Sequence, residues 1–276
     1  MQNKIHVLNI QCSIGQPHKG VVISNKQIKD LFPSNIQKNI DIQQIPKQVF
    51  EKSSSLLYII NKCIEFQEKY RSPIFFGGDH YASFFTVLSS LVIYGNNFRL
   101  IWLDAHGDIH NMRTSPSGNK HGMPVRFLME HTIPGIPQLK PNQILYIGLR
   151  DLEREEWSYI NRHKIKYIRS NDLSGSNLPP RYDQSDIKNI IRFSKGKNIH
   201  ISLDVDVLDP MIMASTGTLA EGGLSMNMFK YIYNIISQNG NIIAFDIMEY
   251  NPSLGNKEEK KTAKNTISQI VNYLYS

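Results

Sequence analysis

The 276-residue sequence has few cysteines and no long hydrophobic run. Its only cysteines are Cys12 and Cys63, which excludes the dense disulfide framework of small secreted domains. No stretch approaches about 18 consecutive apolar residues, so no membrane-spanning helix is predicted. The first residues are polar and lead directly into an apolar segment, which does not indicate a secretory signal. We therefore expect two buried thiols in a cytoplasmic protein without a membrane partner.

The sequence also has no cluster of basic residues, although its overall charge is positive. The 31 lysines and arginines exceed the 24 aspartates and glutamates, giving a formal net charge of +7, but they are scattered along the chain. No motif of an RNA- or DNA-binding module accompanies them, so we expect no nucleic-acid partner. Hydrophobic residues make up 41% of the sequence and charged residues 20%, which predicts a packed core instead of disorder.

Apolar segments rich in strand-forming residues alternate with segments of helical periodicity. The predicted strands are 4–11, 72–76, 98–103, 143–147, 198–203 and 241–247. Helices are expected within 50–70 and over 225–237, where Ser225 is the N-cap. A last helix carries its apolar side chains on one stripe: Ala263, Ile267, Ile270, Val271 and Leu274. This alternation predicts an α/β protein with a mainly parallel sheet covered on both faces.

No long linker or change of composition divides the chain. The Pro-rich segment 132–141 is short enough to be an internal loop. No internal repeat is present, and a length of 276 residues is compatible with one large α/β domain. We therefore expect residues 1–276 to form a single domain.

Six candidate metal ligands directly follow three of the predicted strands. They lie in FFGGDH, IWLDAHGD and ISLDVDVLDP and are His80, Asp104, His106, Asp108, Asp204 and Asp206. Ligands of parallel α/β sheets bind beyond the carboxyl ends of the strands, so we expect these side chains to converge at one edge. Four carboxylates and two imidazoles can hold two divalent cations about 3.5–4 Å apart and activate a bridging water as a nucleophile.

The combined spacing of these residues is stronger evidence for a metal site than any one of the three segments alone. An isolated Asp-x-Asp pair is usually part of a solvated loop, and an isolated histidine after a strand is usually a core or helix-cap residue. In extended backbone, however, Asp204 and Asp206 project to the same side. Three further ligand-type residues also occupy alternate positions: Asp104, His106 and Asp108. Carboxylates and imidazoles without thiolates favour Mn²⁺, although Fe, Co and Ni satisfy the same rules.

The charge balance of the predicted site bears on the substrate. Four aspartates and two divalent ions compensate one another, so a cationic substrate would need a further carboxylate. Glu249, in AFDIMEYNP, follows the predicted strand 241–247 and would reach the same edge of the sheet. Taken alone, it could equally be an ordinary exposed glutamate. Asp79 is expected either to cap the following helix or to hydrogen-bond a metal ligand.

The ordered motifs of the sequence resemble the ureohydrolase family, and within it the arginases most closely. The matching segments cover nearly the whole chain in the family's order: GQPHKGV at 15–21, GGDH, DAHGD, SGNKHGMP at 117–124, YIGLRD at 146–151, SLDVDVLDP, TGT at 216–218, EGGL at 221–224 and DIMEYNPSLG at 246–255. Of these, SGNKHGMP and MEYNPSLG separate arginases from agmatinases. The resemblance implies a three-layer α/β/α fold and a homo-oligomer, either a trimer or a hexamer.

The resemblance also implies roles for individual residues. The six candidate ligands match the family's two-manganese site, and Asp108 is counted among the catalytic residues as well. His121 matches the histidine that acts as a proton shuttle. Glu249 matches the carboxylate that pairs with the substrate guanidinium, and Thr218 lies where that end of the pocket is lined.

The amino-acid end of the implied pocket departs from the family. Ser117 and Asn119 match residues that hold the α-carboxylate of arginine. Arginases usually have Asn two residues past the last ligand of DAHxD, where this chain has His110, and usually have Asp near the α-amino group, where it has Glu153. Glu156 keeps the neighbouring acidic position. These changes leave the metal end intact and put the preference for L-arginine in question.

The expected reaction is hydrolysis of the guanidino group of L-arginine to L-ornithine and urea. The guanidinium is a poor electrophile because its charge is delocalised, so a hydroxide bridging two Mn²⁺ ions would serve as the nucleophile. Glu249 would orient the guanidinium above this hydroxide, and His121 would deliver a proton to the departing amine.

The sequence leaves three alternatives open. His110 and Glu153 motivate a related ureohydrolase that acts on agmatine, guanidinobutyrate or formiminoglutamate. A deacetylase of related topology needs a single metal, and the complete set of six ligands argues against it. An inactive homologue with a regulatory or structural role typically loses ligands or the catalytic histidine, and here none is missing.

Overall fold

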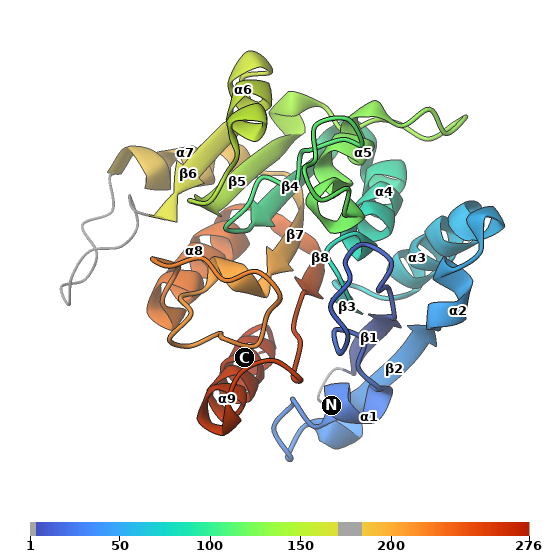
Figure 1. The fold of residues 1–276 in the computed structure, drawn as a ribbon, viewed down its shortest axis with the longest axis vertical. Coiled ribbons are helices and arrows are strands. Elements are labelled where there is room, and N and C mark those ends of the chain that lie inside the picture. The colour runs from blue at the N-terminus through green and yellow to red at the C-terminus, as the bar shows by residue number, and fades with distance from the viewer. Residues whose placement is uncertain (1–3, 171–183, 276) are drawn as a thin grey trace.

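Eight strands form one sheet in the computed structural model, which describes residues 4–170 and 184–275. All neighbouring strands are parallel, and their order is β2-β1-β3-β8-β7-β4-β5-β6 (Figure 1). Their bounds are β1 Ile5–Ile10, β2 Ile40–Ile45, β3 Ile74–Gly77, β4 Phe98–Leu103, β5 Ile144–Leu149, β6 Lys166–Arg169, β7 Asn198–Asp204 and β8 Asn241–Met248. Parallel pairing requires a crossover between strands, and all the helices except the last lie in these crossovers.

Helices cover both faces of the sheet. They are α1 Asn25–Lys29, α2 Lys47–Phe50, α3 Leu56–Lys69, α4 Ala82–Tyr94, α5 Pro124–Glu130, α6 Arg154–Arg162, α7 Gln184–Ser194, α8 Met226–Asn239 and α9 Lys257–Tyr273. Buried residues of α1, α7, α8 and α9 share one apolar cluster with the sheet, whereas those of α3, α4, α5 and α6 share a second cluster with it. The expected three-layer α/β/α fold is confirmed (Figure 1).

All six predicted strands are present, but the sequence did not reveal β2 and β6. These two strands form the edges of the sheet. In β2 only Ile45 is buried, and in β6 only Ile168 is buried. Edge strands carry many polar side chains, so the apolar runs that mark central strands are missing from them.

The predicted helices are present with shifted boundaries. The helix expected within 50–70 begins at Leu56, because residues 47–50 form the separate short helix α2. Ser225 caps α8 as predicted, and its hydroxyl accepts a hydrogen bond from the backbone N–H of Met228 at 3.2 Å. The Pro-rich segment 132–141 is a loop between α5 and β5.

The two cysteines are buried, as expected. Cys12 and Cys63 are both free and buried. Across residues 4–170 and 184–275, none of the helices is both long enough and apolar enough to cross a membrane.

The strand order brings distant parts of the chain together beyond the carboxyl ends of the central strands. The strands β3, β8, β7 and β4 are four consecutive neighbours at the centre of the sheet. Their carboxyl ends lead into the segments that contain His80, Glu249, Asp204 and Asp104, respectively. Because parallel strands end on the same side, these segments meet although up to 169 positions separate them in the sequence.

Candidate active site

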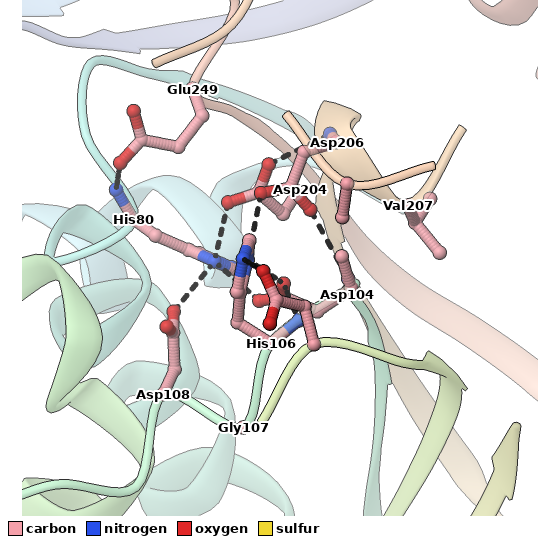
Figure 2. Close-up of polar contacts among 12 residues, drawn as sticks. His80, Asp104, His106, Gly107, Asp108, Asp204, Asp206, Val207 and Glu249 are labelled. Atoms are coloured by element: carbon pink, nitrogen blue, oxygen red, sulfur yellow. Dashed lines mark hydrogen bonds and ion pairs between the residues drawn. The ribbon is translucent and has the colours of Figure 1, made fainter. Parts of the chain in front are cut away.

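Three of the six predicted ligands surround an imidazole nitrogen of a fourth, His80 (Figure 2). His80 Nδ1 lies 3.1 Å from Asp104 Oδ2, 3.0 Å from Asp108 Oδ2 and 3.1 Å from Asp204 Oδ2. The His80 side chain is buried, as are the three carboxylates. These three oxygens and one nitrogen therefore point at a common centre from three different loops.

The other two predicted ligands form a second group beside the first. His106 Nδ1 lies 3.0 Å from Asp206 Oδ2 and 3.5 Å from Asp104 Oδ1. Asp104 thus presents one carboxylate oxygen to each group. Two sets of ligand atoms lie close enough together to hold a metal ion, one of His80, Asp104 and Asp108 and one of Asp104, His106 and Asp206. All six residues come together as the sequence predicted.

Close packing against β1 positions the His80 loop. The backbone N–H of Gly78 donates to Ile10 O at 2.9 Å, and that of Asp79 donates to Cys12 O at 3.0 Å. A side chain at position 78 would overlap the carbonyl oxygen of Cys12, so only glycine fits there. The Asp79 carboxylate accepts a hydrogen bond from Gly15 N–H at 2.6 Å. Asp79 therefore fastens the N-terminal loop to the site, a role that the sequence did not indicate.

The backbone after β7 differs from the extended chain expected there. Residues 205–207 form a 3-10 turn, and Asp206 N–H donates to Asp204 Oδ1 at 2.9 Å. The two carboxylates face the site because the chain turns, and the argument from strand alternation was wrong. Arg150 fixes this turn, since its guanidinium donates to the carbonyl oxygens of Asp206 at 2.6 Å and Ala220 at 2.9 Å.

Two residues of the site have left-handed backbone conformations. Asp108 has a φ of 49° and Glu249 a φ of 64°, and only two other non-glycine residues of the described ranges have positive φ. This conformation is costly for residues with a side chain and persists where surrounding contacts enforce it. The strain is concentrated at the site, as is common for functional residues.

A buried hydrogen-bond chain continues from His80 into the protein. His80 Nε2 lies 3.0 Å from Ser202 Oγ, which lies 2.9 Å from Ser83 Oγ. Ser83 donates to Asp246 Oδ2 at 2.8 Å, and His200 Nε2 lies 2.8 Å from Asp246 Oδ1. Because an ionised carboxylate only accepts, the chain starts with a hydrogen on His80 Nε2. His80 Nδ1 is then the nitrogen that faces the aspartates, and it can bind a metal ion once it has lost its proton.

Burial and crowding of like charges shift the pKa values in the site. Burial and the charge of Asp104 raise the pKa of Asp108 to about 7. Burial and the charge of Asp79 raise the pKa of Glu249 to about 8. For His80, burial lowers the pKa, but contacts with the surrounding aspartates outweigh it and raise the pKa well above its usual value. Protons thus compensate a negative charge that a bound cation would otherwise compensate.

Four of the six predicted ligands, two from each group, border a cavity of about 240 Å³. Its metal end is formed by His106, Asp108, Asp204 and Asp206, and its distal end by His110, Ser117, Glu153 and Glu156. Seven lining residues carry a carboxylate: Asp108, Asp151, Glu153, Glu156, Asp204, Asp206 and Glu249. No lining residue in the described ranges is a lysine or arginine, although the chain as a whole carries a net charge of +7. The cavity therefore favours a cationic ligand.

Glu249 and His121 lie together beside the metal end. Glu249 Oε1 accepts a hydrogen bond from His80 N–H at 2.9 Å and lies 3.3 Å from His121 Nδ1. The amide of Gln16 donates to the other carboxylate oxygen of Glu249. Thr218 also lines the cavity. Glu249 is thus a buried carboxylate held from three sides.

The distal end contains most of the residues expected to bind the amino-acid part of a substrate. Ser117, His110, Glu153 and Glu156 all line the cavity. Asn119 lies beside this lining, and its backbone N–H donates to Ser117 Oγ at 3.2 Å.

Two residues with direct roles in the geometry of the site escaped the sequence analysis. Gln16 contacts Glu249 across 233 positions of sequence, and Arg150 contacts Asp206 across 56. Both lie inside family motifs, GQPHKGV and YIGLRD, but the motifs alone do not indicate a role for either residue. A lone glutamine or arginine has no spacing that marks it as functional, so only the folded chain reveals these contacts.

The site has the donor set of a divalent-cation site. His80 Nδ1 and Asp108 Oδ2 are buried and lie 3.0 Å apart, but neither forms a hydrogen bond of regular geometry with a described residue. Unpaired buried polar atoms are rare in folded proteins and require an explanation. Oxygen and imidazole donors without thiolate suit Mn²⁺ and similar ions.

Comparison with known proteins agrees with this geometry. Residues 14–275 match the family model described as the arginase family. The arginase of Schizosaccharomyces pombe is 29% identical to this chain over 299 residues, which cover 98% of the chain and 91% of that protein.

Solved structures extend the comparison to three dimensions. The crystal structure of arginase from Bacillus subtilis superimposes with a TM-score of 0.81 at 27% identity and covers 99% of this chain and 98% of its own. The formimidoylglutamase of Bacillus subtilis has a TM-score of 0.77 at 18% identity over 99% of this chain and 88% of its own. At that identity the second likeness concerns the fold alone.

Proposed function

The chain belongs to the arginase family and is a hydrolase of amidino C–N bonds, and from this premise we propose that it hydrolyses L-arginine to L-ornithine and urea. The observation that carries the proposal is the six-residue ligand cluster at one end of a cavity lined by carboxylates. The cluster suits divalent cations, and the cavity suits a cationic substrate.

We propose that two Mn²⁺ ions are held by the six predicted ligands. These are His80, Asp104, His106, Asp108, Asp204 and Asp206. The buried His80 Nδ1, which faces three carboxylates, and the shared position of Asp104 between two ligand groups support two ions and not one. When bound, divalent ions supply a nucleophile near neutral pH by lowering the pKa of water.

Glu249 would hold the guanidinium of the substrate. Its carboxylate is buried and faces the cavity, where a guanidinium can bind a carboxylate through two parallel N–H donors. His80 N–H and the Gln16 amide fix the carboxylate, so the bound guanidinium would have one orientation. A fixed orientation places the central carbon of the guanidinium next to the ligand cluster.

His121 would supply the proton that the departing amine requires. Its Nδ1 lies 3.3 Å from Glu249 Oε1, so the ring would be adjacent to a guanidinium bound there. The side chain is 23% exposed, which lets it exchange protons with solvent between turnovers. A partly exposed imidazole next to the reacting group fits a general acid.

The decisive experiment is a substrate panel assayed after loading with Mn²⁺. Urea release from L-arginine would be compared with hydrolysis of agmatine, guanidinobutyrate and formiminoglutamate by kcat/KM. A preference for L-arginine, together with two bound metal ions per chain, is the expected result. A clear preference for another compound would replace arginine with that substrate, and a single bound metal would contradict the two-ion site.

The alternative substrate class rests on the distal end of the cavity. His110 Nε2 lies 3.3 Å from Glu153 Oε2, so the residues that depart from the usual arginase pattern contact each other. A related ureohydrolase acting on agmatine, guanidinobutyrate or formiminoglutamate is the second candidate. The absence of lysine and arginine from the described cavity lining disfavours formiminoglutamate, which carries two carboxylates.

We also propose that the protein is a single domain, that it is cytoplasmic, and that it assembles as a trimer or hexamer. One sheet that includes strands from both halves of the chain supports a single domain. The free, buried thiols of Cys12 and Cys63 suit a reducing compartment. The trimer or hexamer follows from the family resemblance, and light scattering of the purified protein would test it.

A further inference from the structure

At the distal end of the cavity, one imidazole nitrogen faces two glutamates. The His110 side chain is buried, and its Nδ1 lies 3.1 Å from Thr114 Oγ1. Its Nε2 lies 3.3 Å from Glu153 Oε2 and 3.8 Å from Glu156 Oε2. Nδ1 is therefore hydrogen-bonded within its own loop, and Nε2 faces two carboxylates of another segment without a regular hydrogen bond to either.

The hydrogen on His110 can be assigned from these contacts. The Thr114 hydroxyl oxygen accepts a hydrogen bond from Asn111 N–H at 3.0 Å, which leaves its own hydrogen free to donate to His110 Nδ1. A bare Nε2 would present a lone pair to two carboxylates, which is electrostatically unfavourable. Nε2 therefore carries a hydrogen, on the side of the ring that faces Glu153 and Glu156, although neither contact has the geometry of a regular hydrogen bond.

The two glutamates are not equally available to a substrate. Glu156 is buried, and its oxygens accept from Glu153 N–H at 3.1 Å and from Ile109 N–H at 3.4 Å. The Glu153 side chain is 50% exposed and lies at the start of α6. The Glu156 carboxylate is thus occupied by hydrogen bonds from the backbone, and Glu153 is the carboxylate that can bind a ligand at this end.

We propose that His110 is a positioning residue that aims the Glu153 carboxylate at an ammonium group on the far end of the substrate. A substrate carboxylate near His110 Nε2 would lie against two glutamates, whereas an ammonium there would gain from both. The preferred substrate class is therefore a guanidino compound with a second, ammonium group. This inference rests on the proposed function, because it concerns the same cavity.

Three guanidino compounds separate the two possible roles of His110. L-arginine carries both an ammonium and a carboxylate, agmatine carries only the ammonium, and 4-guanidinobutyrate carries only the carboxylate. In H110N we expect KM for arginine and agmatine to rise by the same factor, about tenfold, the scale of one charge-assisted hydrogen bond. We expect kcat to be unchanged and KM for 4-guanidinobutyrate to be unaffected.

A matched variant distinguishes positioning from a general packing effect. In H110Q the amide nitrogen can reach the place of Nε2, whereas in H110N it reaches only the place of Nδ1. We therefore expect H110Q to retain most of the affinity for agmatine. E153Q should weaken arginine and agmatine as H110N does, and the double variant H110N/E153Q should lose little more than either single variant, because both act through one contact.

The opposite selectivity would overturn the inference. If H110N weakens arginine and 4-guanidinobutyrate but spares agmatine, His110 binds the substrate carboxylate directly. Equal losses for all three compounds, with no rescue by H110Q, would indicate a packing role and would also contradict the proposal. Calorimetric binding of the three compounds to the Mn²⁺-loaded protein gives the same comparison without turnover. Failure of the wild type to release urea would thus reject the proposed function while still testing this inference.

Discussion

The two ends of the cavity are built in different ways. At the metal end, the side chains follow the carboxyl ends of central strands, and buried hydrogen bonds to Ser202 and Arg150 hold the ligands or their backbone. At the distal end, His110 lies in a loop after β4 and Glu153 at the first turn of α6, with a half-exposed side chain. In the proposed function, bond cleavage takes place at the carboxyl ends of the central strands, and the surrounding loops select the substrate. Such loops can change without disturbing the chemistry.

This difference predicts effects of unequal size at the two ends. A ligand supported by a buried network cannot be replaced by rearrangement, because every neighbour is already committed. A half-exposed side chain can be replaced in part by water. Substitutions should therefore abolish activity at the metal end and shift KM at the distal end.

The largest effect is expected for D206A. This variant removes a carboxylate that belongs to one ligand set and lies 3.0 Å from His106 Nδ1. We expect bound manganese to fall and urea release to drop to background. D209A is the matched control, because the Asp209 carboxylate accepts from Met211 N–H in a turn of the same loop. Undiminished activity in D206A would remove the two-metal hypothesis.

The next effect in size is expected for H121N. We expect unchanged metal content but a loss in kcat on the order of 10²–10⁴, the usual contribution of general acid–base catalysis. H131N is the control, since His131 contacts the backbone at Pro137, outside the cavity lining. A kcat equal to that of the wild type would mean that the proton comes from another group.

A smaller effect is expected for D246N, which changes no residue of the cavity. Asp246 is the final acceptor in the chain of hydrogen bonds that starts at His80 Nε2. Replacing it should weaken Mn²⁺ affinity by about 10–100-fold, as is typical when a group behind a metal ligand is lost. D30N, at the exposed end of α1, should have no effect. Calorimetric titration with Mn²⁺ measures both, and equal affinities would show that the chain does not orient His80.

The smallest effect is a dependence of stability on pH in the metal-free protein. The folded protein holds the Asp108 proton more tightly than the unfolded chain does, with a pKa of about 7 instead of about 3.9. This contribution to the free energy of unfolding is therefore full below about pH 3.9 and is lost as the pH rises through about 7. The pKa of His80 is also raised, so its contribution to the free energy of unfolding also falls as the pH rises above the ordinary pKa of histidine.

Thermal unfolding of metal-free protein between about pH 6 and 8 tests this dependence. We expect Tm to fall as the pH rises, and we expect added Mn²⁺ to reverse the trend because deprotonated ligands bind metal better. D108N should show a weaker dependence on pH. A Tm that rises with pH in the absence of metal would contradict the assigned protonation.

The sequence was sufficient for the central part of the fold and for the ligands. Central strands such as β4 are buried on both faces and are therefore continuous apolar runs, and the ligands stand directly after them. The edge strands β2 and β6 lack that signal because solvent covers one side of them. The turn at 205–207 also escaped prediction, because it depends on contacts of Arg150 that no local pattern encodes.

The sequence predicted which residues lie at the distal end of the cavity but not which atoms they contact. His110, Glu153 and Glu156 were identified as neighbours of one pocket from the order of motifs alone. Whether His110 would face a substrate or a glutamate depends on distances of a few ångströms between a loop and a helix start. Sequence spacing does not determine such distances, since the loop and the helix meet only in the folded chain.

The position of β8 has a consequence for biosynthesis. This strand is the last of the eight in the chain, yet it is inserted between β3 and β7 in the middle of the sheet. Until residues 241–248 leave the ribosome, β3 and β7 each lack a neighbour, and the strand that leads to Glu249 is missing. Long-range pairing of this kind is slow to form. The nascent protein should therefore remain inactive and sensitive to proteolysis until its final segment closes the gap.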